Sequence, residues 1–292
     1  MKPLSKNKRR GYFISLCIVF VIGAPLFVLN ARGYRLNWNN VLKPSQTGGL
    51  YISTDQSGIE IYVDRLLVKE TSIVQKSIFV PDIKPGMHEV NVSKDGLQSW
   101  NKTLKVFPEI VTEARSFLMK SSPELLEIPR FFNPQTPGAA TSSKEIPLRN
   151  MEYDAINALF LPLAVGTTSS KAATTSPDDK ILNNMLVKND TGKLHVFWTG
   201  KIDLIPNYFC ENIVCKSEII VNTASRVLSY DLFPGRNDIL ILRLADGIYV
   251  SEIDDRSPQN IQKIVSEPGY DFRTKDGKIY LKRDEKIYAV SP

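Results

Sequence analysis

Histidine and cysteine are scarce in this chain, which has two histidines and three cysteines among 292 residues. A structural zinc site takes about four such ligands close together. The histidines, His88 and His195, are far apart in the sequence. These counts limit both metal-site and nucleophile chemistry. We therefore predict no metal site, no cofactor site and no catalytic site.

Motifs for catalysis and nucleotide binding are also missing. The sequence has no G-x-S-x-G nucleophile elbow. It has no P-loop, no G-x-G-x-x-G and no H-E-x-x-H. Asp178-Asp179 and Asp254-Asp255 are adjacent pairs, and neighbours on a strand point to opposite faces, so they make poor catalytic pairs. The sequence favours a protein that is not an enzyme.

Basic residues outnumber acidic ones, but the excess is confined to the N-terminus. The formal net charge is +6, from 37 Lys and Arg against 31 Asp and Glu. Subtracting the five basic residues at the N-terminus leaves 32 basic against 31 acidic residues, so the rest of the chain is nearly neutral. A nucleic-acid partner requires a concentrated basic field on the folded part, and we predict none. The five residues are Lys2, Lys6, Lys8, Arg9 and Arg10.

Residues 12–29 carry no charged side chain. Eighteen residues of helix are about 27 Å long, close to the hydrocarbon thickness of a bilayer. We predict a transmembrane helix over residues 11–31. The basic tail, 1–10, has more positive charge than the segment after the helix. The positive-inside rule therefore places the tail in the cytoplasm and the bulk of the chain outside.

A cleaved signal peptide is the alternative to an anchor. Its apolar core is usually about 7 to 15 residues long and ends at a small-x-small site. Leu29-Asn30-Ala31 has a large residue where a small one is needed, which favours an uncleaved single-pass anchor. Residues 32–48 are polar and indicate a short linker.

Alternation of apolar and polar residues begins at about Gly49 and continues to Phe107. This period is typical of half-buried strands, and glycine and proline mark the turns. The alternating sets are Ile59, Ile61 and Val63, then His88, Val90 and Val92, then Leu104 and Val106. Because His88 alternates with valines, we interpret it as a sheet residue rather than a ligand or a base.

This segment resembles a PEGA domain, a small β module of bacterial and archaeal surface proteins. The family tetrapeptide appears as Gln56-Ser57-Gly58-Ile59, which retains only the glycine, and the usual Asp-Gly appears as Asp64-Arg65. The opening half is similar from Leu50-Tyr51-Ile52-Ser53-Thr54 onward. The better half is Pro85-Gly86-x-His88-x-Val90-x-Val92-x-x-x-Gly96, followed by Trp100.

The resemblance implies a small β-sandwich over residues 49–118 with no catalytic residues of its own, a module that binds or spaces. Tyr62 and Trp100 are candidates for a sugar-stacking surface, and packing in the core or at a sheet edge is the alternative. Trp100 is in either case the large apolar residue that covers the small core.

Residues 119–180 change in character. Stretches such as 133–143 and 166–177 are rich in Ser, Thr, Pro and Ala and poor in large apolar residues, so we predict a linker with flexible loops. Between these stretches, Tyr153 to Val165 is apolar enough to form a strand or a short helix docked on the part that follows.

From Ile181 to Pro292 the strand pattern returns with a recurring phrase. A glycine followed by a strand occurs at Gly192, Gly247 and Gly277. The spacings average near the roughly 40 to 45 residues of a propeller blade. The block resembles the WD40-like blades of TolB-type β-propellers.

The length of this block limits the propeller interpretation. Residues 181–292 suffice for two to three blades of about 40 to 45 residues, or about four if the count starts at Ser121. Since a closed propeller needs at least about four blades, we predict an incomplete, propeller-like sheet array. Such an array has either an exposed sheet edge or a partner that covers it.

Cys210 and Cys215 are separated by four residues. A redox C-x-x-C motif is absent, and a metal site would need further ligands for which only His195 is a candidate. An outside location allows a disulfide that closes a short turn. We predict that disulfide, with free thiols as the alternative.

Three functions follow from this organisation. The first is a non-catalytic, mostly β, membrane-anchored extracytoplasmic protein that presents its modules to a cell-wall polysaccharide or an envelope protein. The alternative is an envelope hydrolase, similar to a glycosidase, with carboxylates on propeller loops; it requires two inward-facing acids about 5 to 9.5 Å apart. The third is an assembly subunit that recruits a partner through an open sheet edge.

Overall fold

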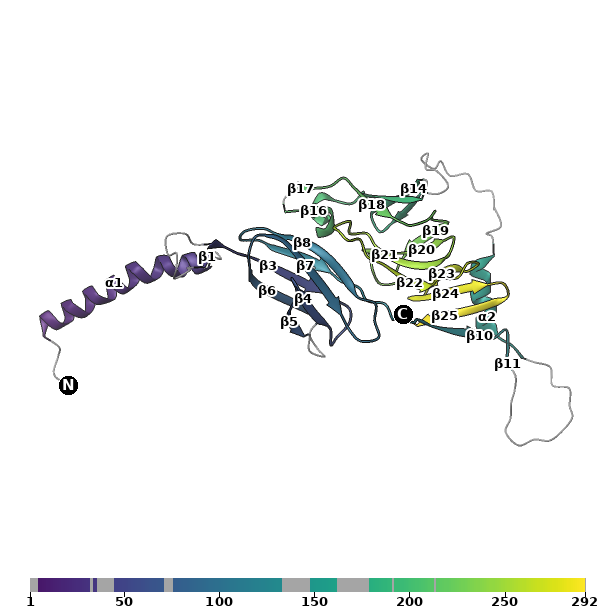
Figure 1. Ribbon diagram of the computed structural model, residues 1–292, viewed down its shortest axis with the longest axis horizontal. Helices are drawn as coiled ribbons and strands as arrows, with labels where there is room; N and C mark the ends of the chain where they lie inside the picture. The colour runs from purple at the N-terminus through teal and green to yellow at the C-terminus, as the bar shows by residue number, and fades with distance from the viewer. Residues whose placement is uncertain are drawn as a thin grey trace, which may run out of the picture. The chain divides into compact units, whose positions relative to one another are not determined.

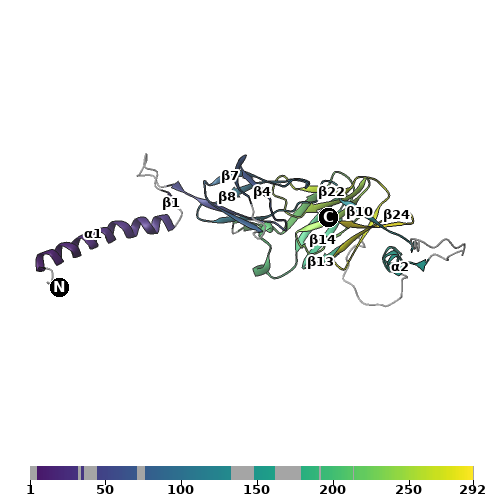
Figure 2. The same ribbon diagram turned by 90° about the horizontal axis from the view of Figure 1, so that it is seen from below.

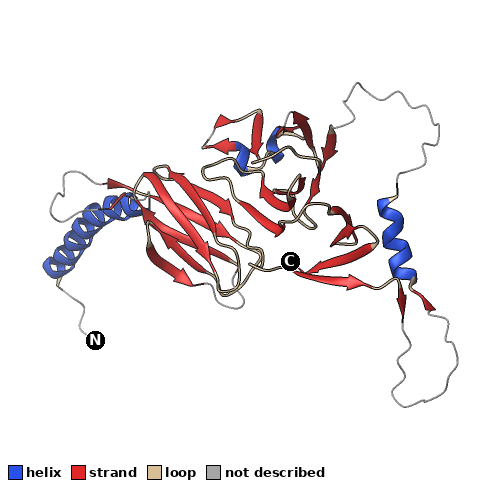
Figure 3. Cartoon of the chain, turned by 45° about the vertical axis from the view of Figure 1, so that its right-hand side comes forward, coloured by secondary structure: helices blue, strands red, loops and turns tan. Residues whose placement is uncertain are grey.

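Strands make up most of the regular structure, as Figure 3 shows, so the predicted mostly-β class is confirmed. The structure, a computed structural model, describes residues 5–31, 34–35, 45–70, 76–132, 148–161, 179–190, 192–212 and 214–291. By compactness the chain divides into two units, which are described separately. The first unit is 1–90 with 103–116, and the second is 91–102 with 117–292. The domain boundaries expected from the sequence stay predictions.

Helix α1 (Lys6–Ala31) begins five residues before the predicted span and contains all of the uncharged run. None of its described side chains is buried, and its 26 residues correspond to about 39 Å. Within the described part of the chain, it is the one helix long and apolar enough to cross a membrane (Figure 1). A signal sequence near an N-terminus can meet the same criteria of length and apolar composition. After α1, most of the expected linker 32–48 lies outside the described residues, apart from the short pair β1 (Tyr34–Arg35) and β2 (Ser45–Gln46).

One sheet of the first unit has three strands in the order β6-β3-β9. The pair β3–β6 is antiparallel and the pair β3–β9 is parallel. Its strands are β3 (Gly48–Ser53), β6 (Ser77–Ile83) and β9 (Val111–Arg115). Leu50 and Ile52 of β3 are buried and Tyr51 between them is exposed, so this sheet has one buried and one exposed face.

A second sheet has the order β5-β4-β7-β8. Its strands are β4 (Glu60–Val63), β5 (Leu66–Glu70), β7 (Gly86–Ser93) and β8 (Trp100–Val106). Ile61 and Val63 are buried, as are Val90 and Val92, in agreement with the alternation in the sequence. Two sheets that each bury one face are what the expected small sandwich requires.

The second unit contains three four-stranded antiparallel sheets (Figure 1). The first, in the order β13-β14-β15-β18, is built from β13 (Lys180–Leu182), β14 (Met185–Asp190), β15 (Lys193–Trp198) and β18 (Glu218–Asn222). The next follows chain order and is built from β19 (Ser229–Leu232), β20 (Ile239–Leu244), β21 (Gly247–Glu252) and β22 (Ile261–Val265).

The third of these sheets has the order β10-β25-β24-β23. It takes strand β10 (Glu124–Ile128) from an earlier part of the chain and pairs it with the last strand. The other strands are β23 (Asp271–Lys275), β24 (Lys278–Arg283) and β25 (Lys286–Ser291). No closed barrel occurs among the residues that the structure describes.

The recurring glycine phrase marks hairpin turns in all three sheets, but for two physical reasons. Gly192 and Gly277 have φ of +98° and +74°, which favours glycine. Gly247 has no positive φ; a Cβ there would lie 2.1 Å from the Val265 carbonyl oxygen. Gly277 lies between β23, the edge strand of its sheet, and β24 beside it. The other two glycines lie between the two central strands of their sheets, so the three copies are not equivalent in position.

Helix α2 (Met151–Asn157) and the 3-10 turn η1 (Ala158–Phe160) form the docked helix that was one of the two expectations for this region. Tyr153 and Ile156 are buried and pack in one cluster with Tyr280 and Ile287. The helix therefore lies against the β10–β25–β24–β23 sheet, beside β10 and β24 in Figures 1 and 2. Of the predicted loops, residues 133–147 and 162–178 lie outside the described residues, with Val165 among the latter.

Candidate functional site

Trp100, one of the two expected sugar-stacking residues, is fully buried. Its indole Nε1 donates a hydrogen bond of 2.9 Å to Glu252 Oε2. A side chain with no exposed ring face cannot stack on a sugar, so this half of the expected surface is wrong, and the core alternative holds for Trp100. Tyr62 is half-buried, and its hydroxyl donates to Glu60 Oε2 at 2.8 Å. A ligand role for Tyr62 stays a prediction.

Beside Trp100 lies a buried lysine, Lys102, that the sequence analysis did not single out. Its ammonium donates to Glu252 Oε1, to the Asp254 carbonyl oxygen at 3.1 Å and to the Arg256 carbonyl oxygen at 2.8 Å. A lysine ammonium has three donors, so all three are satisfied here. Lys102 is therefore a paired, fully bonded charge rather than a free nucleophile.

Glu252 is the acceptor at the centre of this cluster. Oε1 accepts from the Asn260 backbone N–H at 2.6 Å and from Asn260 Nδ2 at 2.7 Å, in addition to Lys102. With Trp100 on Oε2, the carboxylate accepts four hydrogen bonds. Burial raises the pKa of the Glu252 carboxyl, and the Lys102 ammonium offsets part of that rise. A carboxylate with this many partners is suited to holding structure together and poorly suited to proton transfer.

Two amides extend the polar cluster. Asn260 Nδ2 donates to the Asn101 carbonyl oxygen at 2.7 Å, and Asn260 Oδ1 accepts from the Asn101 N–H at 3.0 Å. Gln262 Oε1 accepts from the Met119 N–H at 2.7 Å. Gln262 Nε2 also donates to the carbonyl oxygens of Gln98 and Ser99. The bonds of Asn260 and Gln262 thus join segment 91–102 to β22 and the residue before it, in agreement with the place of the segment in the second compact unit.

A signal for Lys102 and Glu252 was present in the sequence. In β8, Trp100, Lys102 and Leu104 share the buried phase of the alternation. In β21, Ile248, Val250 and Glu252 do the same. A charged residue on the apolar phase of a strand must find a partner if it is buried. Two such residues of opposite sign are candidates for a buried pair.

The first unit exposes a different pair of aromatic residues. Tyr51 of β3 and Phe79 of β6 lie directly opposite each other on the exposed face of the β6–β3–β9 sheet. Tyr51 is 37% and Phe79 52% exposed. Val111 of β9, opposite Gly49, is exposed on the same face. The sequence did not indicate this pair, because alternation shows that the two faces of a strand differ and not which face is buried.

His88 lies in β7, and both of its ring nitrogens have hydrogen-bond partners. Nδ1 is 2.6 Å from Asp64 Oδ2, and Nε2 is 2.7 Å from the Lys84 carbonyl oxygen. Asp64 Oδ1 also accepts from the Glu89 N–H at 3.0 Å. His88 is thus a bonded sheet residue, as expected.

Asp64 and Arg65 have φ of 51° and 67°, so the turn has the left-handed backbone in which the usual Asp-Gly is favoured. Arg65 takes this conformation without a glycine. Partial burial acts to raise the pKa of Asp64, but the hydrogen bonds from His88 and the Glu89 N–H outweigh it, and the pKa lies below its ordinary value.

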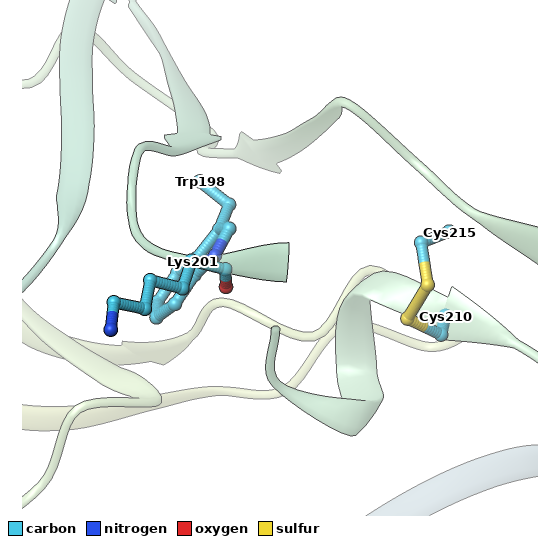
Figure 4. Close-up of a disulfide and its surroundings, with 4 residues drawn as sticks. All are labelled: Trp198, Lys201, Cys210 and Cys215. Carbon is cyan, nitrogen blue, oxygen red and sulfur yellow. Dashed lines mark hydrogen bonds between the residues drawn. A yellow bond between two sulfur atoms is a disulfide. The ribbon is translucent and has the colours of Figure 1, made fainter. Parts of the chain in front are cut away.

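Cys210 and Cys215 are joined by a disulfide in the structure. They lie opposite each other in a two-stranded hairpin, β16 (Cys210–Glu211) and β17 (Val214–Cys215) (Figure 4). Phe209 before the hairpin is buried in the core, and Trp198 Nε1 donates to the Lys201 carbonyl oxygen at 2.9 Å. The hairpin is therefore anchored in the sheet region. The oxidised state of these cysteines in the cell stays a prediction.

Among the described residues, no group of three or more His, Cys, Asp or Glu side chains is placed to hold a metal ion. His195 Nδ1 is paired with Glu218 Oε1 at 2.5 Å, across the β15–β18 pair. His195 is therefore hydrogen-bonded to a glutamate of the neighbouring strand rather than placed as a ligand with Cys210 or Cys215.

Comparison with known families gives one match: residues 47–122 match the PEGA domain. This segment contains the strands β3 to β9 described above. The resemblance of these residues to a PEGA domain is therefore confirmed. The PEGA domain is a surface or extracellular domain. No curated protein matches the chain.

Proposed function

We propose that the protein is a non-catalytic, membrane-anchored, extracytoplasmic protein of the cell envelope that binds or spaces an envelope component. The observation that carries the proposal is the apolar helix α1 followed by a β module that matches the PEGA domain. A surface-type domain after a membrane-spanning length of helix is the arrangement of a tethered module. The partner we propose is a cell-wall polysaccharide or an envelope protein.

The proposed topology has the N-terminus in the cytoplasm and both compact units outside. Its support is the basic tail before α1, because positive residues flanking a spanning helix favour the cytoplasmic side. The disulfide of the hairpin fits an oxidising compartment, where such bonds persist.

We propose further that the second unit is an incomplete β-propeller. Support comes from its three four-stranded antiparallel sheets, the last of which takes β10 from an earlier part of the chain. Completing one sheet with strands from both ends of a segment is a way of joining the ends of a repeated array. Three blades are fewer than the roughly four that a closed propeller needs.

Surface labelling of intact cells tests the topology. After mild reduction, Cys210 and Cys215 should react with a membrane-impermeant maleimide, and Cys17 within α1 should not. A Cys17→Ser variant is the matched control and should be labelled as the unchanged protein is. In a separate test, protease added to intact cells should remove the PEGA module. If both cysteines are labelled only after lysis, the chain lies in the cytoplasm and the proposal is wrong.

Binding is tested with the full-length protein in detergent and with isolated cell envelopes of the source organism. We expect a larger fraction of this protein to sediment with the envelopes than of a detergent-solubilised membrane protein that has no PEGA module. Absence of that sedimentation leaves no basis for a binding role.

A further inference from the structure

The exposed face of the β6–β3–β9 sheet has an aromatic surface that is built rather than incidental. A Cβ at Gly49 would lie 2.7 Å from Phe79 Cε2 and 3.1 Å from Phe79 Cζ. The Phe79 ring therefore occupies the space above Gly49, which only glycine leaves open. A ring held over the sheet in this way keeps its outer side toward solvent, and Phe79 is 52% exposed.

Tyr51 and Val111 extend this surface. Tyr51 is the cross-strand neighbour of Phe79, and Val111 is the neighbour of Gly49 on the other side. Side chains directly opposite each other on neighbouring strands have Cβ atoms about 4.5 to 5.5 Å apart, so Tyr51 and Phe79 form one continuous surface.

The charges at the edge of this surface favour a neutral ligand. Glu113 is the neighbour of Tyr51 on β9, and Arg115, two residues further, is paired with Asp55 at 2.8 Å. A cation already paired with a carboxylate is a weak attractor for an anionic polymer. The hydroxyl of Tyr51 suits the hydroxyl groups of a ligand, which both donate and accept hydrogen bonds.

We propose that Phe79 and Tyr51 form a stacking surface for a neutral hexopyranose unit of an envelope polysaccharide. This inference depends on the binding function proposed above and names its ligand class and its surface. The C–H groups on one face of a pyranose ring carry partial positive charge, and the faces of aromatic rings carry negative charge. A flat sugar face and an outward aromatic face are therefore complementary, and the polar groups at the edge contact the equatorial hydroxyls.

Sedimentation with isolated envelopes tests the surface. In Phe79→Ala we expect binding to weaken about tenfold, the scale seen when one stacking aromatic side chain is removed. Phe79→Tyr keeps the ring and should bind within about twofold of the unchanged protein. Phe131→Ala, which removes an aromatic side chain that is 46% exposed in the second unit, is the matched control and should bind normally. Thermal unfolding of each variant verifies that the fold is retained.

Treatment of the envelopes identifies the ligand class. Periodate opens sugar rings that carry vicinal hydroxyls, so it should abolish the Phe79-dependent binding, and protease should leave that binding intact. A soluble neutral glucan should compete better than polygalacturonate, an anionic polysaccharide. Protease-sensitive binding, stronger competition by polygalacturonate, or Phe79-dependent binding to lipid vesicles would each overturn the inference.

The two proposals fail in different ways. If the unchanged protein and Phe79→Ala bind envelopes equally, the stacking surface is wrong and the binding function remains. If the unchanged protein does not bind envelopes at all, both proposals are wrong.

Discussion

The two compact units each contain a carboxylate paired with a basic side chain, and the two pairs differ in their exposure to solvent. In the first unit, Asp64 at a turn is paired with His88 of β7, and their side chains are 49% and 14% exposed. Lys102 and Glu252 of the second unit are almost completely buried. The pKa of Asp64 is lowered by its hydrogen bonds, whereas burial raises the pKa of Glu252 despite more hydrogen bonds. The degree of burial therefore decides whether hydrogen bonding or desolvation sets the direction of the pKa shift.

The same contrast applies to the aromatic residues. Trp100 is enclosed and uses its N–H to anchor Glu252, and Phe79 is held over a glycine with one side in solvent. A buried side chain such as Trp100 stabilises the fold, and an exposed side chain such as Phe79 is accessible to a ligand. The polar cluster thus lies in the second unit and the proposed stacking surface in the first.

Removing the buried cation should have the largest effect. Lys102→Met leaves Glu252 buried without its counter-charge, and we expect a loss of about 3 to 5 kcal/mol in the free energy of unfolding. The measurement is urea unfolding of the full-length protein in detergent, followed by tryptophan fluorescence.

Two variants sharpen this result. Lys102→Met with Glu252→Gln removes both charges and should recover a large part of the loss, because no unpaired charge remains buried. Lys105→Met, on the exposed side of β8, should change the stability by less than about 0.5 kcal/mol. A Lys102→Met protein as stable as Lys105→Met would show that the pair is not buried in solution.

The disulfide, a covalent link on the surface, should have an intermediate effect. Replacing Cys210 and Cys215 with serine opens a short loop. The unfolded chain then gains conformational entropy, and the free energy of unfolding should fall by about 2 kcal/mol. Thermal unfolding with and without a reductant measures this effect. The unchanged protein should become less stable on reduction, the double variant should not respond, and Cys17→Ser should behave as the unchanged protein does. A reductant-independent melting temperature would mean that the cysteines are free.

The exposed pair should have the smallest effect. Asp64→Asn removes a carboxylate whose pair with His88 is screened by solvent, so we expect a loss of about 1 kcal/mol or less at neutral pH. The pKa of Asp64 is lowered in the folded state, so its stabilisation is present above the unfolded-state pKa and disappears as the pH falls through the folded-state pKa. The stability difference between the unchanged protein and Asp64→Asn should thus vanish in acid.

Glu252 should show the opposite sign. Its folded-state pKa is raised, so its contribution becomes less favourable as the pH rises from the unfolded-state to the folded-state value. Unfolding measured as a function of pH, with Glu252→Gln as the reference, detects this trend. If the stability contributions of Asp64 and Glu252 changed in the same direction with pH, the contrast between an exposed and a buried pair would be contradicted.

Several features could be predicted because they depend on local periodicity. The uncharged run 12–29 predicts α1, and the alternation at Ile61 and Val63 predicts β4 and its buried side. Hairpin glycines such as Gly192 are visible because a positive φ excludes most other residues. The pairing of β10 with β25 could not be predicted, because nothing local in residues 124–128 indicates a partner more than a hundred residues away.

The candidate surfaces show the same limit more sharply. Tyr62 and Trp100 were chosen for residue type alone, and the structure encloses Trp100 beside Glu252, 152 residues away. Tyr51 and Phe79 become a surface only through the register of β3 with β6 and through the glycine under the ring. Neither the register nor the proximity is a property of one segment.

By itself the sequence determined the apolar helix, the neutral charge of the remaining chain, the strand content and the PEGA module, because each depends on composition or on a period of a few residues. Only the tertiary structure decided which aromatic side chains face solvent and which charges meet. Burial and pairing depend on contacts between distant segments, and those contacts set both the desolvation of Glu252 and the exposure of Phe79.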